Sequence, residues 1–269
     1  MNVGILIIGD EILSGRRQDK HLAKVIELLA ARGMSLDWAE YVGDDPARIT
    51  ATLQRTFASD GIVFSTGGIG ATPDDHTRQC VAAALGVPLE LHPEARELIA
   101  GRIREMHDAS LGPVDLDSPE NRRRFDMGVF PQSATIIPNS FNRIPGFSVR
   151  DHHFVPGFPV MAWPMIEWVL DTYYRDLHHA KPYLERSLFV FKLPESTITP
   201  LMQAIESEFP AVRVFSLPTV ADAARGGIFA RSHIDLGVKG EPQAAALAYE
   251  RLREGVLALG GEIVEQNDE

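Results

Sequence analysis

In the first third of the chain, short apolar runs alternate with stretches whose apolar residues recur at helical spacing. Short unbroken apolar runs, typical of strands covered on both faces, span Val3–Ile8, about Leu36–Val42 and Ile62–Ser65. Apolar residues also recur at helical spacing in three stretches, with the stripes Leu22, Val25, Ile26 and Leu29, then Ile49, Leu53 and Phe57, and then His76 through Leu85. Three strand and helix units joined by short loops predict a doubly wound, mostly parallel α/β sheet with right-handed crossovers.

The ends of these helices carry recognisable signals. Gly33 ends the first helix, Asp45 caps the second, and Gly86 ends the third. The pattern then predicts a helix over Glu94–His107 with the stripe Leu98, Ile99, Ile103 and Met106, a loop over 108–119, strands at Ala134–Pro138, Gly146–Val149 and His153–Pro156, and a helix over Met161–Tyr174.

A second series of apolar runs and helical stripes begins near Ala180-Lys181-Pro182. It predicts a strand at Ser187–Leu193, a helix capped by Ser196 or Thr197, strands at Val212–Leu217 and Gly227–Gly237, and a helix over Pro242–Leu259. We therefore expect an α/β domain over residues 1–178 and a smaller α+β domain over residues 182–269.

The carboxyl ends of the first three strands are the segments richest in Gly and Asp. These segments are Gly9–Gly15, Gly43–Asp45 and Thr66–Asp75, and ligands of parallel sheets bind at such ends. The loop Thr66-Gly67-Gly68-Ile69-Gly70 lies between a buried strand and a helix, so its backbone N–H groups are suited to hold a phosphate. The alternative is a tight connection without a ligand.

Acidic residues accompany this loop. Asp74 and Asp75 are adjacent, and the fold places Asp44 or Asp45 on the neighbouring strand end. Carboxylates crowded to ~4 Å repel by roughly 4 kcal/mol at an effective dielectric near 20, so such a cluster needs a cation, a shared proton or hydrogen bonds. Mg²⁺ or a similar hard ion suits these oxygen ligands beside phosphates. Helix capping is the alternative role for Asp74 and Asp75.

The turn after the first strand has the same character. Gly9-Asp10-Glu11-Ile12-Leu13-Ser14-Gly15 combines acids with small residues between two glycines, which favours a loop that faces the ligand. Capping of the next helix would also explain Asp10 and Ser14.

Composition narrows the classes of protein that fit. Apolar residues make up 45% of the chain and charged residues 23%, with a net charge of −11, which argues against a binder of nucleic-acid backbones. No apolar stretch is long enough to span a membrane, and the start lacks the basic flank of a signal peptide, so we expect a cytoplasmic protein. The single cysteine, Cys80, lies in an apolar helix stretch and is predicted to be core.

These motifs resemble the competence/damage-inducible protein A family. The matching segments are Gly9-Asp10-Glu11, Val42-Gly43-Asp44, Thr66 to Gly70 followed by Asp74-Asp75 and Thr77, and Asn121-Arg122-Arg123. The N-terminal part of that family is similar to the molybdopterin-binding domain shared with molybdopterin adenylyltransferases. The resemblance implies that the glycine loop holds a pterin or nucleotide phosphate. It also implies that Asp44 and Asp75, with Asp74, belong to a catalytic metal region.

The chain departs from the family pattern in two segments and, as a smaller change, has Ala71 where proline is common after the glycine loop. Where the family reads Asn-Pro-x-Gly-x-Ala-Pro-Gly, Asn139 to Gly146 keeps the ends but loses the central glycine. Where it reads Leu-Pro-Gly-Val-Pro-x-Glu-Met, Val155 to Ala162 lacks the glutamate. The residues that still match and are predicted to line the ligand site are Asn139, Pro145, Gly146, Pro156 and Gly157.

The resemblance leaves three functions open. Some family members are metal-dependent pyrophosphatases of ADP-ribose-like or flavin dinucleotides, whereas the lost glutamate favours a domain that binds molybdopterin or a nucleotide without turnover. A regulatory subunit is the third. The resemblance also implies a KH-like second domain and a homo-oligomer, while the net charge of −4 over residues 180–269 argues against RNA. Longer members add an amidohydrolase domain for nicotinamide mononucleotide, an activity we expect to be absent from a chain that ends at Glu269.

Overall fold

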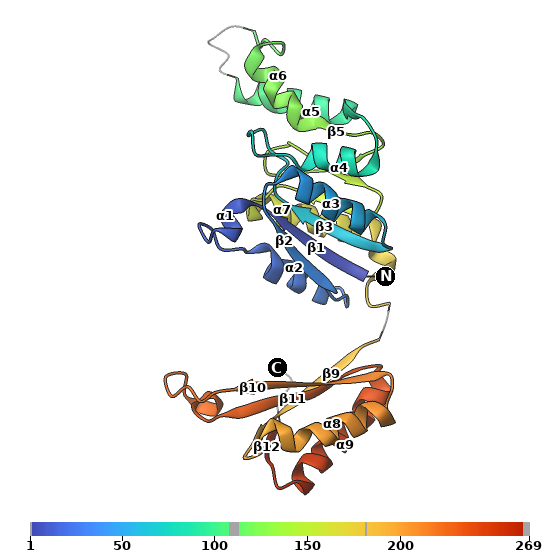
Figure 1. The fold of residues 1–269 in the computed structure, drawn as a ribbon. Helices are drawn as coiled ribbons and strands as arrows, with labels where there is room; N and C mark the ends of the chain where they lie inside the picture. Colours follow the sequence, from blue (N-terminus) through green and yellow to red (C-terminus); the bar gives the residue numbers. More distant parts are fainter. Residues whose placement is uncertain (1, 108–112, 181, 266–269) are drawn as a thin grey trace. The chain divides into compact units, whose positions relative to one another are not determined.

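The computed structural model describes residues 2–107, 113–180 and 182–265. By its internal contacts the chain divides into unit 1, Met1–His179, and unit 2, Ala180–Glu269 (Figure 1). Each unit has its own hydrophobic core. In the described part of the chain, no helix has the length and apolar character needed to cross a membrane.

Unit 1 is built on a six-stranded sheet. Three of its five strand pairs are parallel and two are antiparallel, which confirms the predicted mostly parallel α/β fold. Across the sheet the strands lie in the order β2 (Trp38–Val42), β1 (Asn2–Ile8), β3 (Gly61–Thr66), β8 (His152–Val155), β7 (Gly146–Val149) and β6 (Thr135–Ile137).

Helices cover both faces of this sheet because successive side chains of a strand point to opposite faces. Ile5 and Phe64 pack with α2 (His21–Ala30) and α7 (Pro159–Tyr173). Leu6 and Val63 pack on the other face with α3 (Pro46–Phe57), α4 (Thr77–Leu85) and α5 (Pro93–Met106). Two layers of helix around buried strands are what the unbroken apolar runs predicted.

Helix packing differs from the predicted stripes at two positions. Ile26 is 48% exposed and Met106 is 57% exposed, so both predictions of burial are wrong. In α2 the buried residues are His21, Val25, Leu28 and Leu29, so the buried face keeps Val25 and Leu29 of the predicted stripe and contains Leu28 rather than Ile26.

The sequence pattern did not predict several short elements between residues 87 and 131. β4 (Leu89–Leu91) and β5 (Val129–Pro131) form a two-stranded antiparallel sheet, and three residues each are too few for a periodic pattern. Of the predicted loop over 108–119, residues 108–112 lie outside the described residues. Pro119 already begins α6 (Pro119–Phe125), which Ser118 caps through the backbone N–H of Asn121.

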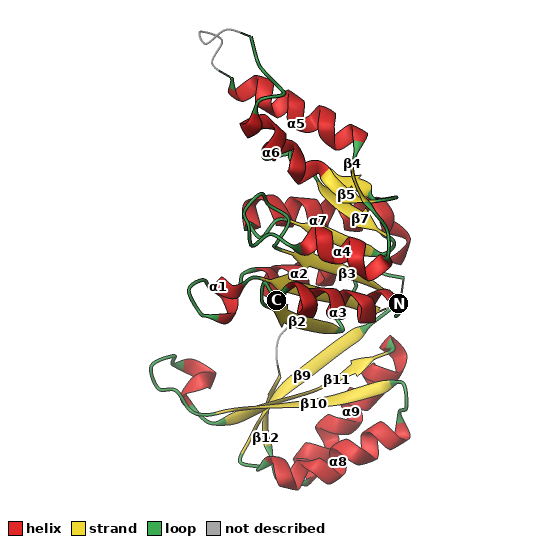
Figure 2. Ribbon diagram, turned by 45° about the horizontal axis from the view of Figure 1, so that its top comes forward, coloured by secondary structure: helices red, strands yellow, loops and turns green. Residues whose placement is uncertain are grey.

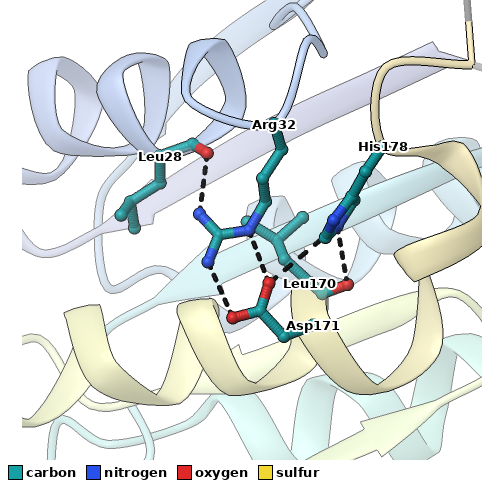
Figure 3. Close-up of polar contacts among 5 residues, drawn as sticks. All are labelled: Leu28, Arg32, Leu170, Asp171 and His178. Carbon is teal, nitrogen blue, oxygen red and sulfur yellow. Dashed lines mark hydrogen bonds and ion pairs between the residues drawn. The ribbon is translucent and has the colours of Figure 1, made fainter.

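An arginine clamp fixes α2 against α7 (Figure 3). Arg32 donates from Nε and Nη2 to the two carboxylate oxygens of Asp171, at 2.7 and 2.8 Å, and from Nη1 to the Leu28 carbonyl at 2.9 Å. These bonds lower the pKa of Asp171, and the same pairing raises the pKa of Arg32. The clamp therefore joins the C-terminal end of α2 to the last turn of α7.

Unit 2 is a four-stranded antiparallel sheet with two helices on one face (Figure 2). Its strand order is β10 (Val212–Thr219), β11 (His233–Gly240), β9 (Leu184–Phe191) and β12 (Glu262–Glu265), and its helices are α8 (Glu195–Glu208) and α9 (Pro242–Ala258).

Two predictions in unit 2 are wrong. The strand predicted at Gly227–Gly237 starts only at His233, because η4 (Gly227–Ala230) is a 3₁₀ turn with two positive-φ glycines at its start. The cap predicted at Ser196 or Thr197 is also wrong, since α8 begins at Glu195 without a side-chain cap.

Candidate functional site

Four parallel strands end at one edge of the sheet of unit 1, which we call the carboxyl edge. β1, β2, β3 and β8 run in the same direction, and the segments that follow them begin at Gly9, Gly43, Gly67 and Pro156. The β6–β7 hairpin turns at the same edge, because its closing pair, Ile137 and Gly146, lies on the Val155 side of β8. In Figure 1, the short helix α1 (Asp10–Leu13) marks this edge.

The glycine loop packs against the ends of two neighbouring strands. A Cβ atom on Gly67 would lie 2.2 Å from the Ile8 carbonyl oxygen, and φ at Gly67 is +98°. The backbone N–H of Gly67 donates to the Val155 carbonyl at 3.1 Å, and the Cβ position of Gly157 lies 3.5 Å from the Gly67 Cα. Only glycine permits this approach, which holds the loop between β1 and the segment after β8.

All four carbonyl groups from Gly67 to Gly70 accept hydrogen bonds from the first two residues of α4. Thr77 donates from Oγ1 to the Gly67 carbonyl at 3.1 Å and from its backbone N–H to the Gly68 carbonyl at 3.0 Å. Arg78 donates from Nη1 to the Ile69 carbonyl and from Nη2 to the Gly70 carbonyl, both at 2.7 Å. The carbonyl face of the loop is therefore fully occupied by α4.

The N–H groups of the same four peptide units are unpaired. Within the described residues, the amides at positions 68 to 71 donate no hydrogen bond. In a planar trans peptide the N–H points opposite to the C=O, so these four N–H groups face away from α4. A row of such groups around positive-φ glycines attracts an anion.

Acidic side chains bridge the ends of β1 and β2. The backbone N–H of Asp10 donates to the Asp44 carboxylate at 2.9 Å, and the N–H of Asp44 donates to the Asp10 carboxylate at 3.2 Å. Burial raises the pKa of Asp44, and the charges of Asp10, Glu11 and Asp74 raise it further, against the effect of the Asp10 N–H. The structure therefore brings Asp10, Glu11, Asp44 and Asp74 within electrostatic reach of one another.

Asp75 is engaged within its own loop. Its Oδ2 accepts from the N–H of Thr72 at 2.8 Å and from the Thr72 hydroxyl at 2.6 Å, while Asp74 is exposed. Among the described residues, no three His, Cys, Asp or Glu side chains are grouped closely enough to hold a metal ion. Asp44, Asp74 and Asp75 thus share one edge, but the structure does not gather them into a ready-made ligand set.

The remaining predicted ligand residues lie at the two ends of the carboxyl edge. Ser14 and Gly15 follow α1 and are exposed, and a Cβ atom on Gly15 would meet nothing within 4 Å. In the β6–β7 hairpin, Asn139 is buried and bonds inside the turn, to the Asn142 side chain and the Ile144 carbonyl at 2.9 Å each. Asn142 is the residue that replaces the central glycine of the family, and it accepts from Asn139 in this turn.

Pro145 and Gly146 close that hairpin and are buried. A Cβ atom on Gly146 would lie 2.4 Å from the Phe154 carbonyl oxygen, which explains the glycine by strand packing. Arg143 pairs with Glu105 on α5 at 2.7 Å and so is directed to that helix.

Three residues of this edge were not singled out from the sequence. His21 donates from Nε2 to the Gly157 carbonyl at 3.0 Å, Arg78 holds the glycine loop, and Phe158 is 55% exposed beside Gly157. A signal existed for Arg78, because it lies in helical register with the apolar residues Val81 and Ala82. No local pattern marks His21, whose partner is 136 residues away in the chain.

The adjacent histidines of β8 serve the core. His153 bonds to Ser148 at 2.8 Å and to the Tyr174 hydroxyl at 2.7 Å, while His152 bonds to Thr56 at 2.9 Å on the other face of the sheet. Burial lowers the pKa of His152 to about 4 and that of His153 to about 3. Cys80 is buried as predicted.

Comparison with known proteins identifies the family of unit 1. Residues 4–178 match the family described as a probable molybdopterin binding domain. The chain belongs to this family. A CinA-like protein of Anaeromyxobacter dehalogenans is 32% identical over 277 residues, which cover 98% of this chain and 61% of the relative. The chain therefore spans about three fifths of the length of that relative.

Two further relatives extend the comparison of this molybdopterin-binding domain protein. A protein of Aeropyrum pernix is 29% identical over 268 residues and is covered to 96% of its length. The solved structure of CinA from Thermoplasma acidophilum, described as having unknown function, aligns with a TM-score of 0.53 and 25% identity over 63% of this chain and 96% of that one. The predicted family resemblance is confirmed.

Proposed function

We propose that unit 1 binds a pterin or nucleotide ligand through its phosphate groups and hydrolyses a pyrophosphate bridge in that ligand with the help of a divalent cation. The observation that carries the proposal is the row of four unpaired N–H groups at residues 68–71, opposite four carbonyls that α4 occupies. Phosphate oxygens are the natural acceptors for such a row, because they are anionic and accept several bonds at once.

The acids across the carboxyl edge support a cation site. Asp44, whose pKa is raised by burial and by neighbouring carboxylates, gains most from a positive ion nearby. Oxygen ligands of this kind suit Mg²⁺ and similar hard ions, which bind one or two carboxylates together with substrate phosphates. This chemistry fits Asp44 with Asp10 or Asp74, and Asp75 could join after releasing Thr72. A bound cation would polarise the pyrophosphate and generate the attacking hydroxide.

An aromatic side chain beside the loop suits the ring of such a ligand. Phe158 follows Gly157, whose backbone lies against Gly67, and the ring of Phe158 is largely exposed. The Arg17 guanidinium lies 6.0 Å from the centre of that ring. Pterin, flavin and adenine rings stack on aromatic faces, so Phe158 supports a ligand that joins a flat ring to phosphates.

Hydrolysis of ADP-ribose and FAD by the purified chain tests this function. We expect turnover with Mg²⁺ or Mn²⁺, loss of turnover with a chelator, and a reduction of kcat of about 100-fold or more in Asp44→Asn. Asp60→Asn is the matched control, because Asp60 is an exposed acid just before β3, at the opposite edge of the sheet. Turnover that is independent of metal, or unchanged in Asp44→Asn, contradicts the catalytic part.

Binding without turnover is the second candidate function. The observation that favours it is the Asp75 carboxylate, which is held by two hydrogen bonds from Thr72. The glutamate that the family carries after Pro159 is also replaced in this chain. Calorimetry with ADP-ribose, FAD and a pterin phosphate separates the two functions. Retained binding without hydrolysis across this panel would favour the second, and Asp75→Asn would then leave affinity nearly unchanged.

A further inference from the structure

Arg78 is a buried arginine with an unusual set of partners. Its side chain is 4% exposed, and within the described residues no carboxylate lies at ion-pair distance from it. Burial lowers the pKa of Arg78, while the charges of Asp75 and Asp126 act in the opposite direction. The described hydrogen bonds of its guanidinium go to two carbonyls of the glycine loop. Burying a charge on neutral partners is costly, so the arrangement needs an explanation.

The geometry of the guanidinium explains what it does to the loop. Arginine presents its N–H groups in a rigid planar fork, and here two nitrogens hold the carbonyls of Ile69 and Gly70, which are consecutive. Because each peptide unit is planar and trans, fixing these carbonyls also fixes the N–H groups of Gly70 and Ala71 on the far side. Thr77 holds the Gly67 and Gly68 carbonyls in the same way.

We propose that Arg78 is a positioning residue that aims the Gly70 and Ala71 N–H groups of the glycine loop at the phosphate of the ligand. The inference rests on the proposed phosphate site. The positive charge acts from behind the loop, where it polarises two peptide units and makes their N–H groups better donors. Thr77 orients the first two peptide units of the glycine loop, and Arg78 orients the last two.

A lysine at this position would not reproduce the effect. A single ammonium on a flexible stem is a point charge and does not hold two carbonyls in a fixed relation. Arg78→Lys therefore separates the charge of the side chain from its shape. Arg32→Met is the matched control for Arg78→Met, because Arg32 is also a largely buried arginine with a forked set of bonds, and its partners lie on α2 and α7.

The test measures ADP-ribose binding to the full chain by calorimetry, together with the ¹⁵N–¹H signals of residues 68 to 71. In the wild type we expect these four signals to shift on titration. We expect Kd to rise about 10-fold or more in Arg78→Met and several-fold in Arg78→Lys, and to stay unchanged in Arg32→Met, although both methionine variants have a lower Tm. Guanidinium at millimolar concentration should restore part of the affinity in Arg78→Ala and none elsewhere.

The outcomes distinguish this inference from the proposed function. Wild-type signals of residues 68 to 71 that do not respond to ADP-ribose or to inorganic pyrophosphate overturn the phosphate site itself. Responding wild-type signals with equal Kd in folded Arg78→Lys and Arg78→Met overturn only the role of Arg78. An equal loss of affinity in Arg32→Met, without rescue of Arg78→Ala by guanidinium, shows general destabilisation and also overturns it.

Discussion

Replacing Gly67 with alanine should destabilise unit 1 more than any strain of the backbone alone can explain. A left-handed conformation costs a non-glycine residue roughly 1–2 kcal/mol. At Gly67 the new Cβ atom would also lie 2.2 Å from the Ile8 carbonyl oxygen, so the two must separate by about 0.8 Å or more. Ile8 belongs to the packed core of the sheet, and forcing such a shift costs a further ~1–3 kcal/mol.

Gly86→Ala provides the matched control. Gly86 ends α4 at a φ of +67°, and a Cβ atom there would meet nothing within 4 Å, so only the backbone strain applies. The free energy of unfolding should therefore fall by about 1–2 kcal/mol in Gly86→Ala and by about 2–5 kcal/mol in Gly67→Ala. For a unit of this size the difference of about 1–3 kcal/mol corresponds to a Tm about 2–12 °C lower in Gly67→Ala than in Gly86→Ala.

Urea denaturation followed by tryptophan fluorescence measures this difference in unit 1 alone. All three tryptophans, Trp38, Trp163 and Trp168, lie in that unit. Equal midpoints for the two alanine variants, with equal m values, would refute the close approach of the loop to β1. A larger loss in Gly86→Ala would refute it as well.

Three further predictions follow from buried and paired charges. The pKa of His153 in the folded protein is about 3, below its unfolded value near 6.5, so the contribution of this group to stability is full above pH ~6.5 and falls as the pH decreases. We expect a loss of up to ~2 kcal/mol from this group by pH 5, and a shallower pH dependence of the urea midpoint in His153→Gln. The lowered pKa of Asp171 means that its pairing with Arg32 stabilises the folded protein above pH ~4 and that this stabilisation is lost on acidification. In urea titrations Arg32→Met should lower the free energy of unfolding by up to about 1 kcal/mol at pH 7, and the difference from wild type should shrink below pH ~4. The Asp10 carboxylate, whose charge raises the pKa of Asp44, would also attract a cation bound at Asp44, so Mn²⁺ titration calorimetry should show about 10-fold weaker binding to Asp10→Asn than to Asp60→Asn. Equal affinities would speak against a cation at Asp44.

Local pattern in the sequence was sufficient for the main elements of unit 1. The unbroken run Val3–Ile8 predicted a strand buried on both faces, and Asp45 caps α3 by accepting from the Arg48 N–H at 2.8 Å, as Asp45-Pro46 indicated. The order of strands and helices then placed the acids and glycines of three strand ends at one edge. These features are determined by residues a few positions apart, which is the range over which periodicity and capping act.

The arrangement of the side chains at the carboxyl edge depends on contacts that no local sequence pattern predicts. Asp10 and Asp44 exchange hydrogen bonds across 34 residues, and His21 reaches Gly157 across 136. Even the short-range contacts of Asp75 with Thr72 and of Arg78 with the loop carbonyls depend on loop conformation rather than on residue type. The pattern of the chain is enough to predict which groups come to the carboxyl edge, because strand order places them there. Which of these groups are already paired follows only from the folded structure, because hydrogen bonds and burial depend on distances and directions that strand order leaves open.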